Sequence, residues 1–265
     1  VLGEKEWQSA EKSGTSGEGY DVATLELTGL QKELIQKVHA TGTPVIVVLI
    51  NGRPLATPWI AEHVPAVLEA WCPGEKGGEA IAYILFGDYN TSGKLPVTIP
   101  RHVGQLPVYY NHKPSKTYWL EVGWGNSYAD LENQPLWEFG HGLSYTDFTY
   151  SDLQISPEKS KSGNRIHVSV KITNTGTWEG SEIVQLYIRD VKSTVVRPVK
   201  ELKGFRKVKL SPNEGVAVEF ELKPEDLSMY DRNMNRIIEP GVFDVMIGSS
   251  SEKIHINGNY EIITK

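Results

Sequence analysis

The chain has 265 residues, of which 39% are hydrophobic and 23% are charged, and its net charge is −6. This composition supports a packed core and, at about 150 residues per domain, predicts one large or two ordinary domains. The acidic balance disfavours a nucleic-acid partner. A single cysteine excludes a disulfide within the chain and a cysteine-built zinc site. No apolar stretch reaches the roughly 20 residues of a membrane span, and no signal peptide is expected at the start of the sequence.

Strand and helix patterns alternate over the first 100 residues. These strands and helices are recognised by three features: a capping-box spacing at a helix start, runs of β-branched residues, and glycine or proline residues where a helix ends. The predicted elements are the end of a strand at Val1–Gly3, a helix capped by Thr28 with Gln31 three residues later, a strand at Pro44–Ile50 buried on both faces, a buried strand at Ala66–Trp71 and a helix at Gly77–Phe86. Strands separated by helices predict a parallel sheet with helices on its faces.

From about residue 146 the hydrophobic period changes to two. Apolar residues alternate with polar ones over 166–172 and 184–188, which predicts a β-hairpin with a longer loop. Similar runs follow at 205–210, 216–222 and 242–247, and no helix is predicted in this half. Several short strands with turns between them are typical of an antiparallel sandwich of the immunoglobulin or fibronectin type III kind.

The predicted fold class is therefore α/β plus all-β. A mostly parallel αβα sandwich domain is expected at residues 1–115, with its first strand truncated. An antiparallel fibronectin type III-like β-sandwich is expected at 146–265. Residues 116–145 are predicted to be an ordered connector, because flexible linkers do not contain so many Trp and Tyr residues.

Most catalytic motifs are absent from the sequence. Val22 occupies the third-glycine position of a dinucleotide fingerprint, Leu95 replaces the Ser or Thr of a phosphate loop, and Glu18 replaces a glycine of the serine-hydrolase elbow. The seven histidines are scattered, with no pair at i, i+4 beside a carboxylate. We therefore expect no metal and no cofactor.

One loop has a pattern that suits acid–base chemistry. Glu18 lies between Gly17 and Gly19, so its backbone can approach another surface closely. A neighbouring surface that desolvates such a carboxyl would raise its pKa and make it a general acid. The local pattern alone favours the alternative, a solvent-exposed loop glutamate with no chemical role.

A family resemblance instead favours the catalytic role of Glu18. Ser16–Asp21 has the sequence SGEGYD, which resembles a sequence block of glycoside hydrolase family 3, and further blocks follow in the family's order. These blocks are PVIVVLINGRP at Pro44–Pro54, the stretch Leu68–Pro100, PLWEFGHGLSYTDFTYSDL at Pro135–Leu153, VVRPVKELKGFRKVKL at Val195–Leu210 and EPGVFDVMIGSSSEKI at Glu239–Ile254. The chain resembles the C-terminal part of bacterial β-glucosidases and β-xylosidases of this family.

The resemblance implies a retaining exo-acting β-glycosidase. In such enzymes a (β/α)8 barrel, which has no counterpart in this chain, binds the sugar and supplies the nucleophile. The resemblance places the general acid/base at Glu18, with Glu4, Glu6 and Glu11 as rival positions. Tyr20 and Trp7 are implied to line the leaving-group subsite, although both could instead pack the loop, and Asp21 is expected to brace it.

Several features stay open at this stage. The choice between glucose and xylose depends on the absent barrel, and the oligomeric state is not predicted. The resemblance implies a periplasmic or secreted enzyme whose partners are the barrel and an oligosaccharide. The competing hypothesis is a non-catalytic carbohydrate-binding module.

His141, where the family usually has Tyr, is expected to be structural, and Cys72 is expected to be a small buried hydrophobe.

Overall fold

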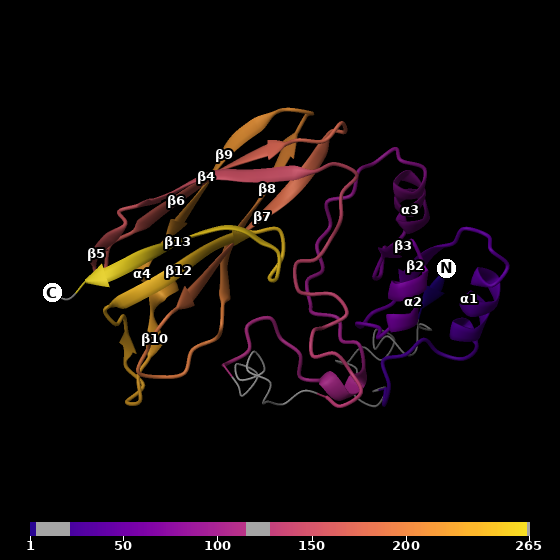
Figure 1. The fold of residues 1–265 in the computed structure, drawn as a ribbon, viewed down its shortest axis with the longest axis horizontal. Helices are drawn as coiled ribbons and strands as arrows, with labels where there is room; N and C mark the ends of the chain where they lie inside the picture. The colour runs from indigo at the N-terminus through magenta and orange to yellow at the C-terminus, as the bar shows by residue number, and fades with distance from the viewer. Residues whose placement is uncertain (4–21, 115–127, 264–265) are drawn as a thin grey trace. The chain divides into compact units, whose positions relative to one another are not determined.

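The computed structural model describes residues 1–3, 22–114 and 128–263. The chain divides into two compact units, each built from more than one segment (Figure 1). Unit 1 comprises Val1–Tyr89, Val97–Val108 and Tyr128–Trp137, and unit 2 comprises Asn90–Pro96, Tyr109–Ser127 and Glu138–Lys265. The domain limits from the sequence stay a prediction, because much of the expected connector lies outside the described residues.

Unit 1 contains a three-stranded parallel sheet in the order β1-β2-β3. The strands are β1 (Leu2–Gly3), β2 (Ile46–Ile50) and β3 (Ala66–Glu69). Leu2 pairs with Leu49, and Ile46 pairs with Ala66. The predicted parallel arrangement is therefore confirmed for these strands.

Two helices cover one face of this sheet. They are α1 (Gln31–His39) and α2 (Pro58–His63). Apolar residues of both helices share a core with alternate residues of β2, because side chains two apart on a strand point to the same face. The buried members of this core are Ile35, Val47, Leu49, Ile60 and Val64.

Details of unit 1 differ from the sequence predictions. The N-cap of α1 is Leu30 rather than Thr28, and it makes no side-chain capping bond. Ile46 at the start of β2 is 53% exposed, so this strand is buried on both faces only in its centre. No described residue of β3 is fully buried. The helix α2 was not predicted; it is only six residues long and begins with Pro58, a residue suited to the first helical turn.

The helix α3 (Gly77–Leu85) confirms the remaining helix prediction, and the 3-10 helix η2 (Val103–Gln105) follows it. No helix in the described residues has the length and apolar character needed to cross a membrane.

Unit 2 is a sandwich of two sheets. One sheet has the order β5-β13-β12-β7-β8 and the other the order β4-β6-β9. All of these pairings are antiparallel except the parallel pair of β13 and β5. The strands are β4 (Phe148–Ser156), β5 (Lys159–Lys161), β6 (Ile166–Asn174), β7 (Gly180–Asp190), β8 (Glu201–Leu210), β9 (Gly215–Leu222), β12 (Gly241–Gly248) and β13 (Ile254–Ile263).

The core of unit 2 consists of the inward residues of both sheets. The alternating pattern found in the sequence corresponds to this inward face. The fully or almost fully buried members include Ile166, Val168, Val170, Ile172, Val184, Leu186, Ile188, Val245 and Ile247. The predicted fold class, α/β plus all-β, is confirmed.

The predicted hairpin between 166–172 and 184–188 is wrong, because β6 and β7 lie in different sheets. Asn174, at the end of β6, holds the crossing between the sheets. Its Oδ1 accepts hydrogen bonds from Thr146 Oγ1 at 2.7 Å and Gly176 N at 3.1 Å. Its Nδ2 donates to the carbonyl oxygens of Trp178 at 2.8 Å and Leu210 at 3.0 Å. This amide therefore satisfies all its hydrogen bonds in a fully buried position.

Small elements complete unit 2. One short helix was not predicted, because a single turn is too short to show a helical period in the sequence. The elements are α4 (Pro224–Leu227) and the paired strands β10 (Met229–Tyr230) and β11 (Arg236–Ile237).

A buried arginine in the loop between β7 and β8 pairs with the last residue of β7. The side chain of Arg197 is 8% exposed, and that of Asp190, its partner at 3.2 Å, is 4% exposed. The guanidinium also donates to Glu201 at 2.9 Å and to the Leu227 carbonyl oxygen at 2.9 Å. Burial raises the pKa of Asp190, although the Arg197 charge opposes this shift. The positive charge of Arg197 therefore compensates the buried negative charge of the Asp190 carboxylate.

Glu138 and His141 form a second polar cluster in unit 2. Glu138 Oε1 accepts a hydrogen bond from Ser250 Oγ at 2.7 Å, and His141 Nδ1 lies 3.3 Å from the same oxygen. Burial by itself raises the pKa of Glu138, but the hydrogen bonds from His141, Ser250 and its own backbone outweigh burial and bring the pKa to about 2. The contacts agree with the structural role expected for His141.

Acidification is expected to destabilise unit 2 through Glu138. A carboxyl whose pKa is lowered by folding contributes stability above its unfolded pKa, near 4.5, and loses it as the pH falls toward 2. Allowing for solvent screening, we expect a loss of about 1–2 kcal/mol. The measurement is the opening free energy of β6 from hydrogen exchange, and Glu138→Gln should remove this part of its pH dependence. Glu219→Gln, at an exposed position of β9, is the control, and an equal effect of both substitutions would contradict the prediction.

Candidate functional site

The predicted site residues lie outside the described part of the chain. This holds for Glu18, Tyr20 and Trp7, for Asp21 and for the rival glutamates at positions 4, 6 and 11. The structure does describe the residues on either side of this segment. We use the name acid/base segment for residues 4–21, and its assignment to catalysis rests on the sequence.

The acid/base segment follows Gly3, the last residue of β1. This is the carboxyl end of a strand in a parallel sheet, and open α/β sheets bind their ligands outside these ends. The carboxyl end of β2, at Ile50, lies at the same edge because Gly3 pairs with Ile50. The segment therefore starts at the edge of unit 1 where a functional site is expected.

Gly3 is fixed by its neighbours. Its backbone N–H donates to Gln31 Oε1 at 2.7 Å, and its carbonyl oxygen accepts from Gln31 Nε2 at 2.7 Å. Its φ is +151°, and a Cβ atom at this position would lie 1.8 Å from the Ile50 carbonyl oxygen. Only glycine fits here, so the position of Gly3 is tightly determined.

The residues that follow the segment are also held. The Leu25 carbonyl oxygen accepts a hydrogen bond from Ala56 N at 2.8 Å. Thr28 Oγ1 accepts a hydrogen bond from Gln31 Nε2 at 3.1 Å. The Thr28–Gln31 pair that the sequence predicted as a capping box is thus a real contact, but it ties a loop to the helix instead of capping it.

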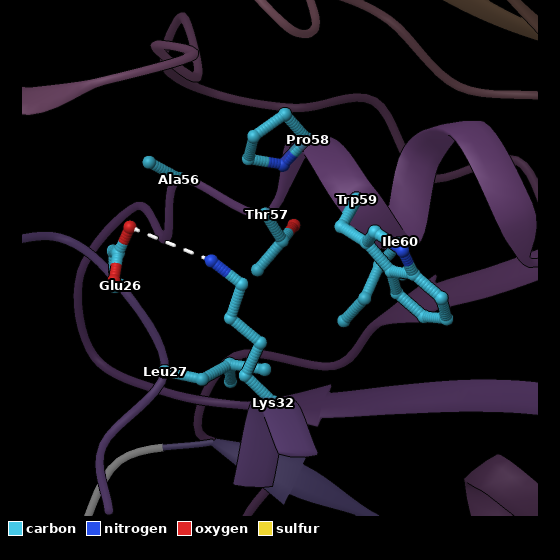
Figure 2. A pocket seen from close by; sticks show the side chains of 8 residues that line it. All are labelled: Glu26, Leu27, Lys32, Ala56, Thr57, Pro58, Trp59 and Ile60. Carbon is cyan, nitrogen blue, oxygen red and sulfur yellow. Dashed lines mark ion pairs between the residues drawn. The ribbon is translucent and has the colours of Figure 1, made fainter. Parts of the chain in front are cut away.

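A small pocket lies next to these residues (Figure 2). Its cavity volume of about 30 Å³ has room for one or two water molecules and is too small for a sugar ring. Figure 2 shows the Lys32 side chain extending toward Glu26, its ion-pair partner at 3.8 Å. Thr57 Oγ1 is buried and has no hydrogen-bond partner among the described residues. The pocket is lined by Glu26, Leu27, Lys32, Ala56, Thr57, Pro58, Trp59 and Ile60.

Two residues that the sequence analysis did not assign to the site follow β2 and β3. Asn51 is buried, and its Nδ2 donates to the Arg53 carbonyl oxygen at 2.9 Å. Trp71 has a φ of +49°, a conformation that costs a residue with a Cβ atom about 1–3 kcal/mol. Hydrogen bonds hold it there, from Asn51 N to its carbonyl oxygen at 3.3 Å and from its own N–H to Glu69 Oε1 at 3.1 Å. No sequence pattern indicates this conformation.

Cys72 corrects a sequence prediction. It was expected to be buried, but it is exposed, and its Sγ donates to the Asn51 carbonyl oxygen at 3.9 Å. The residue lies in a bend that follows the end of β3, outside the sheet. Within the described ranges, no group of three or more His, Cys, Asp or Glu residues is placed to hold a metal ion.

Comparison with known proteins identifies the family. Residues 1–145 match the sequence profile of the glycosyl hydrolase family 3 C-terminal domain. The chain belongs to glycosyl hydrolase family 3. Residues 182–251 match a fibronectin type III-like domain, which agrees with the sandwich of unit 2. The family resemblance stated from the sequence is confirmed.

The proteins similar to this chain include both a β-xylosidase and a β-glucosidase. A β-xylosidase of Formosa agariphila is 44% identical over 238 residues, which are 90% of this chain and 32% of that protein. A periplasmic β-glucosidase of Salmonella typhimurium is 41% identical over 263 residues, which are 96% of this chain and 33% of that protein.

Solved structures give the same result. A β-glucosidase from Erythrobacter marinus matches with a TM-score of 0.90 and 43% identity, over 99% of this chain and 34% of that chain. The β-glucosidase from Listeria innocua in complex with glucose matches with a TM-score of 0.90 and 38% identity, over 99% of this chain and 36% of that chain. The chain therefore spans about a third of the length of these relatives.

Proposed function

We propose that this chain is part of a retaining, exo-acting β-glycosidase that removes terminal non-reducing β-D-glucosyl or xylosyl residues from oligosaccharides or glycosides. The match of residues 1–145 to the C-terminal domain of the family is the observation that supports this most. The relatives named above include both a β-xylosidase and a β-glucosidase, so either sugar fits the proposal.

In this proposal Glu18 is the general acid/base. Retaining glycosidases need two carboxyl groups about 5–5.5 Å apart, one of which is the nucleophile. Glu18 would protonate the glycosidic oxygen as the leaving group departs. It would then deprotonate the water that hydrolyses the glycosyl-enzyme. Its glycine neighbours and its place after the carboxyl end of β1 support this role.

Tyr20 and Trp7 are proposed to line the leaving-group subsite. Both are aromatic and flank Glu18 in the acid/base segment. Sugars present apolar C–H faces that pack against aromatic rings, and the tyrosine hydroxyl adds a hydrogen-bonding group.

The proposed partner is a (β/α)8 barrel that binds the sugar and supplies the nucleophile. It would belong to the same enzyme, since the relatives are about three times as long as this chain. A periplasmic or secreted location is also proposed, on the basis of the name of the Salmonella relative.

The experiment compares this chain, the barrel portion and a mixture of the two on p-nitrophenyl β-glucoside and β-xyloside. Turnover is expected only in the mixture, because neither portion has both carboxyl groups. Turnover by this chain alone would contradict the proposal. Calorimetry with cello- and xylo-oligosaccharides on this chain alone tests the alternative, because tight binding without the barrel would favour a carbohydrate-binding module.

A further inference from the structure

We propose that Leu30, Leu34 and Val38 form a docking surface for the N-terminal part of the complete enzyme, and that the occupant is an apolar helix packed alongside α1. We use the name α1 stripe for these three residues. The inference rests on the proposal that the chain is part of a longer enzyme. Its test measures hydrogen exchange rather than turnover.

The apolar residues of α1 lie on one continuous arc of the helix. Successive residues of an α-helix are about 100° apart around its axis, so positions 30, 34, 38 and 35 follow one another over an arc of about 140°. In this order they are Leu30, Leu34, Val38 and Ile35. Their exposed fractions fall along the arc, from 76% through 55% and 39% to 6%. The core of unit 1 therefore covers only one margin of the apolar arc.

The polar residues of α1 occupy the rest of its circumference. They are Lys32, Glu33, Gln36 and Lys37. Glu33 and Lys37 form an ion pair at 2.6 Å on this side. An amphipathic helix normally turns its whole apolar arc toward a core and its polar side toward water. The exposed α1 stripe belongs to the apolar side, so its composition fits a second packing partner.

The α1 stripe faces away from α2. His39 is on the opposite side of the helix from Leu30, and its ring contacts the Trp59 ring of α2 edge to face, with centroids 5.5 Å apart. The first residue of α1, Gln31, binds Gly3 of β1, which is the outer strand in the order β1-β2-β3. A partner on the α1 stripe would therefore lie beyond β1, on the face of the sheet that α1 and α2 cover.

This place in the fold calls for a helix. Helices pack beside one another on the face of a parallel sheet, and residues at i, i+4 and i+8 form the ridge that packs against a neighbouring helix. Residues 1–145 match a C-terminal domain, and about two thirds of each relative lie outside the part that this chain matches. The N-terminal part of the complete enzyme therefore has enough chain to supply the occupant.

A second copy of this chain fits the α1 stripe less well. A stable dimer buries about 800 Å² on each partner, and three aliphatic side chains provide much less than this area. A helix of the same polypeptide needs no such area, because its covalent connection gives it a high effective concentration at the surface.

The test places Leu34→Glu in the complete enzyme and in this chain alone. Hydrogen exchange of the α1 amides is measured in both by mass spectrometry. In the complete enzyme the new carboxylate would be buried against apolar side chains, so we expect exchange to become about 10- to 100-fold faster. In the chain alone Leu34 is 55% exposed, so the change should be less than about threefold.

Gln36→Glu is the matched control, because it introduces the same residue on the polar side of α1. Its effect should be less than about threefold in both proteins. Unchanged exchange in the complete Leu34→Glu enzyme would overturn the inference. An equally large effect in the chain alone would also overturn it, because the occupant would then be a second copy or another segment of this chain. If the complete Leu34→Glu enzyme does not fold, Leu34→Ala replaces it under the same criteria, with exchange expected to be about 5- to 30-fold faster.

Turnover separates this inference from the proposed function. If the complete enzyme does not hydrolyse glycosides but its α1 exchange responds as expected, the proposed activity fails and the docking surface stands. If it hydrolyses glycosides and α1 exchange does not respond to Leu34→Glu, only the docking surface fails.

Discussion

Replacing Glu18 by glutamine in the complete enzyme is expected to lower kcat/KM for a phenyl β-glycoside by about 10²- to 10⁴-fold. Glutamine keeps the size of the side chain but cannot deliver the proton to the departing oxygen. The rate on a 2,4-dinitrophenyl β-glycoside should fall much less in the first step. Its kcat should still fall, because the water that releases the sugar loses its base. The measurement is steady-state turnover of both substrates.

Azide provides an independent readout in a Glu18→Ala variant. The small anion can enter the space left by the carboxyl and attack the glycosyl-enzyme without a base, so it should restore kcat and yield a glycosyl azide. Glu33→Gln, at an exposed position of α1, is the control and should be unaffected. Unchanged rates in both Glu18 variants would contradict the assignment and direct attention to Glu4, Glu6 and Glu11.

Replacing Arg197 by methionine is expected to destabilise unit 2 by about 3–5 kcal/mol, because it leaves the buried Asp190 carboxylate uncompensated. The measurement is the opening free energy of β6 from hydrogen exchange, which reports on unit 2 alone. Burial already raises the pKa of Asp190 in the native protein. In the variant, stability should therefore rise as the pH is lowered through the folded pKa of this carboxyl, because protonation removes the unpaired charge.

The control for this prediction is Arg165→Met. Arg165 also pairs with a carboxylate, Glu221, but its side chain is 62% exposed. Exposed pairs contribute about 0–1 kcal/mol, so the loss should be small. The double substitution Arg197→Met with Asp190→Asn should regain part of the lost stability. Equal losses for the two arginines, or no recovery in the double variant, would refute a specific role of the buried pair.

The periodicity of the sequence predicted β6 to β9 and β12 in unit 2 but missed the long strands β4 and β13, and it did not show which strands pair. The alternation in β6 corresponds to one buried face, whereas β7 alternates in sequence but is buried on both faces from Val184 to Ile188. Two strands of a hairpin and two strands that face each other across a sandwich have the same alternation. The contacts that Asn174 makes at the crossing reach residues as distant as Leu210 and Thr146, and no local pattern records them.

The sequence likewise predicted some features of the candidate site and not others. The block around Glu18 was recognisable because it has a family-specific sequence. The spacing of Thr28 and Gln31 indicated their contact correctly, but not that the same amide also binds Gly3, since these residues are 28 positions apart. The left-handed conformation of Trp71 was not predictable either, because nothing in its side chain favours it.

The crossing between β6 and β7 also has a kinetic consequence. Since these consecutive strands do not pair, β6 must find β9 and β7 must find β12, with Ile166 opposite Leu222 and Asp190 opposite Phe243. Such distant partners give a high contact order, and the entropy cost of loop closure must be overcome before the strands form their stabilising contacts. We therefore expect the sandwich to refold over milliseconds to seconds, more slowly than a helical bundle of equal size.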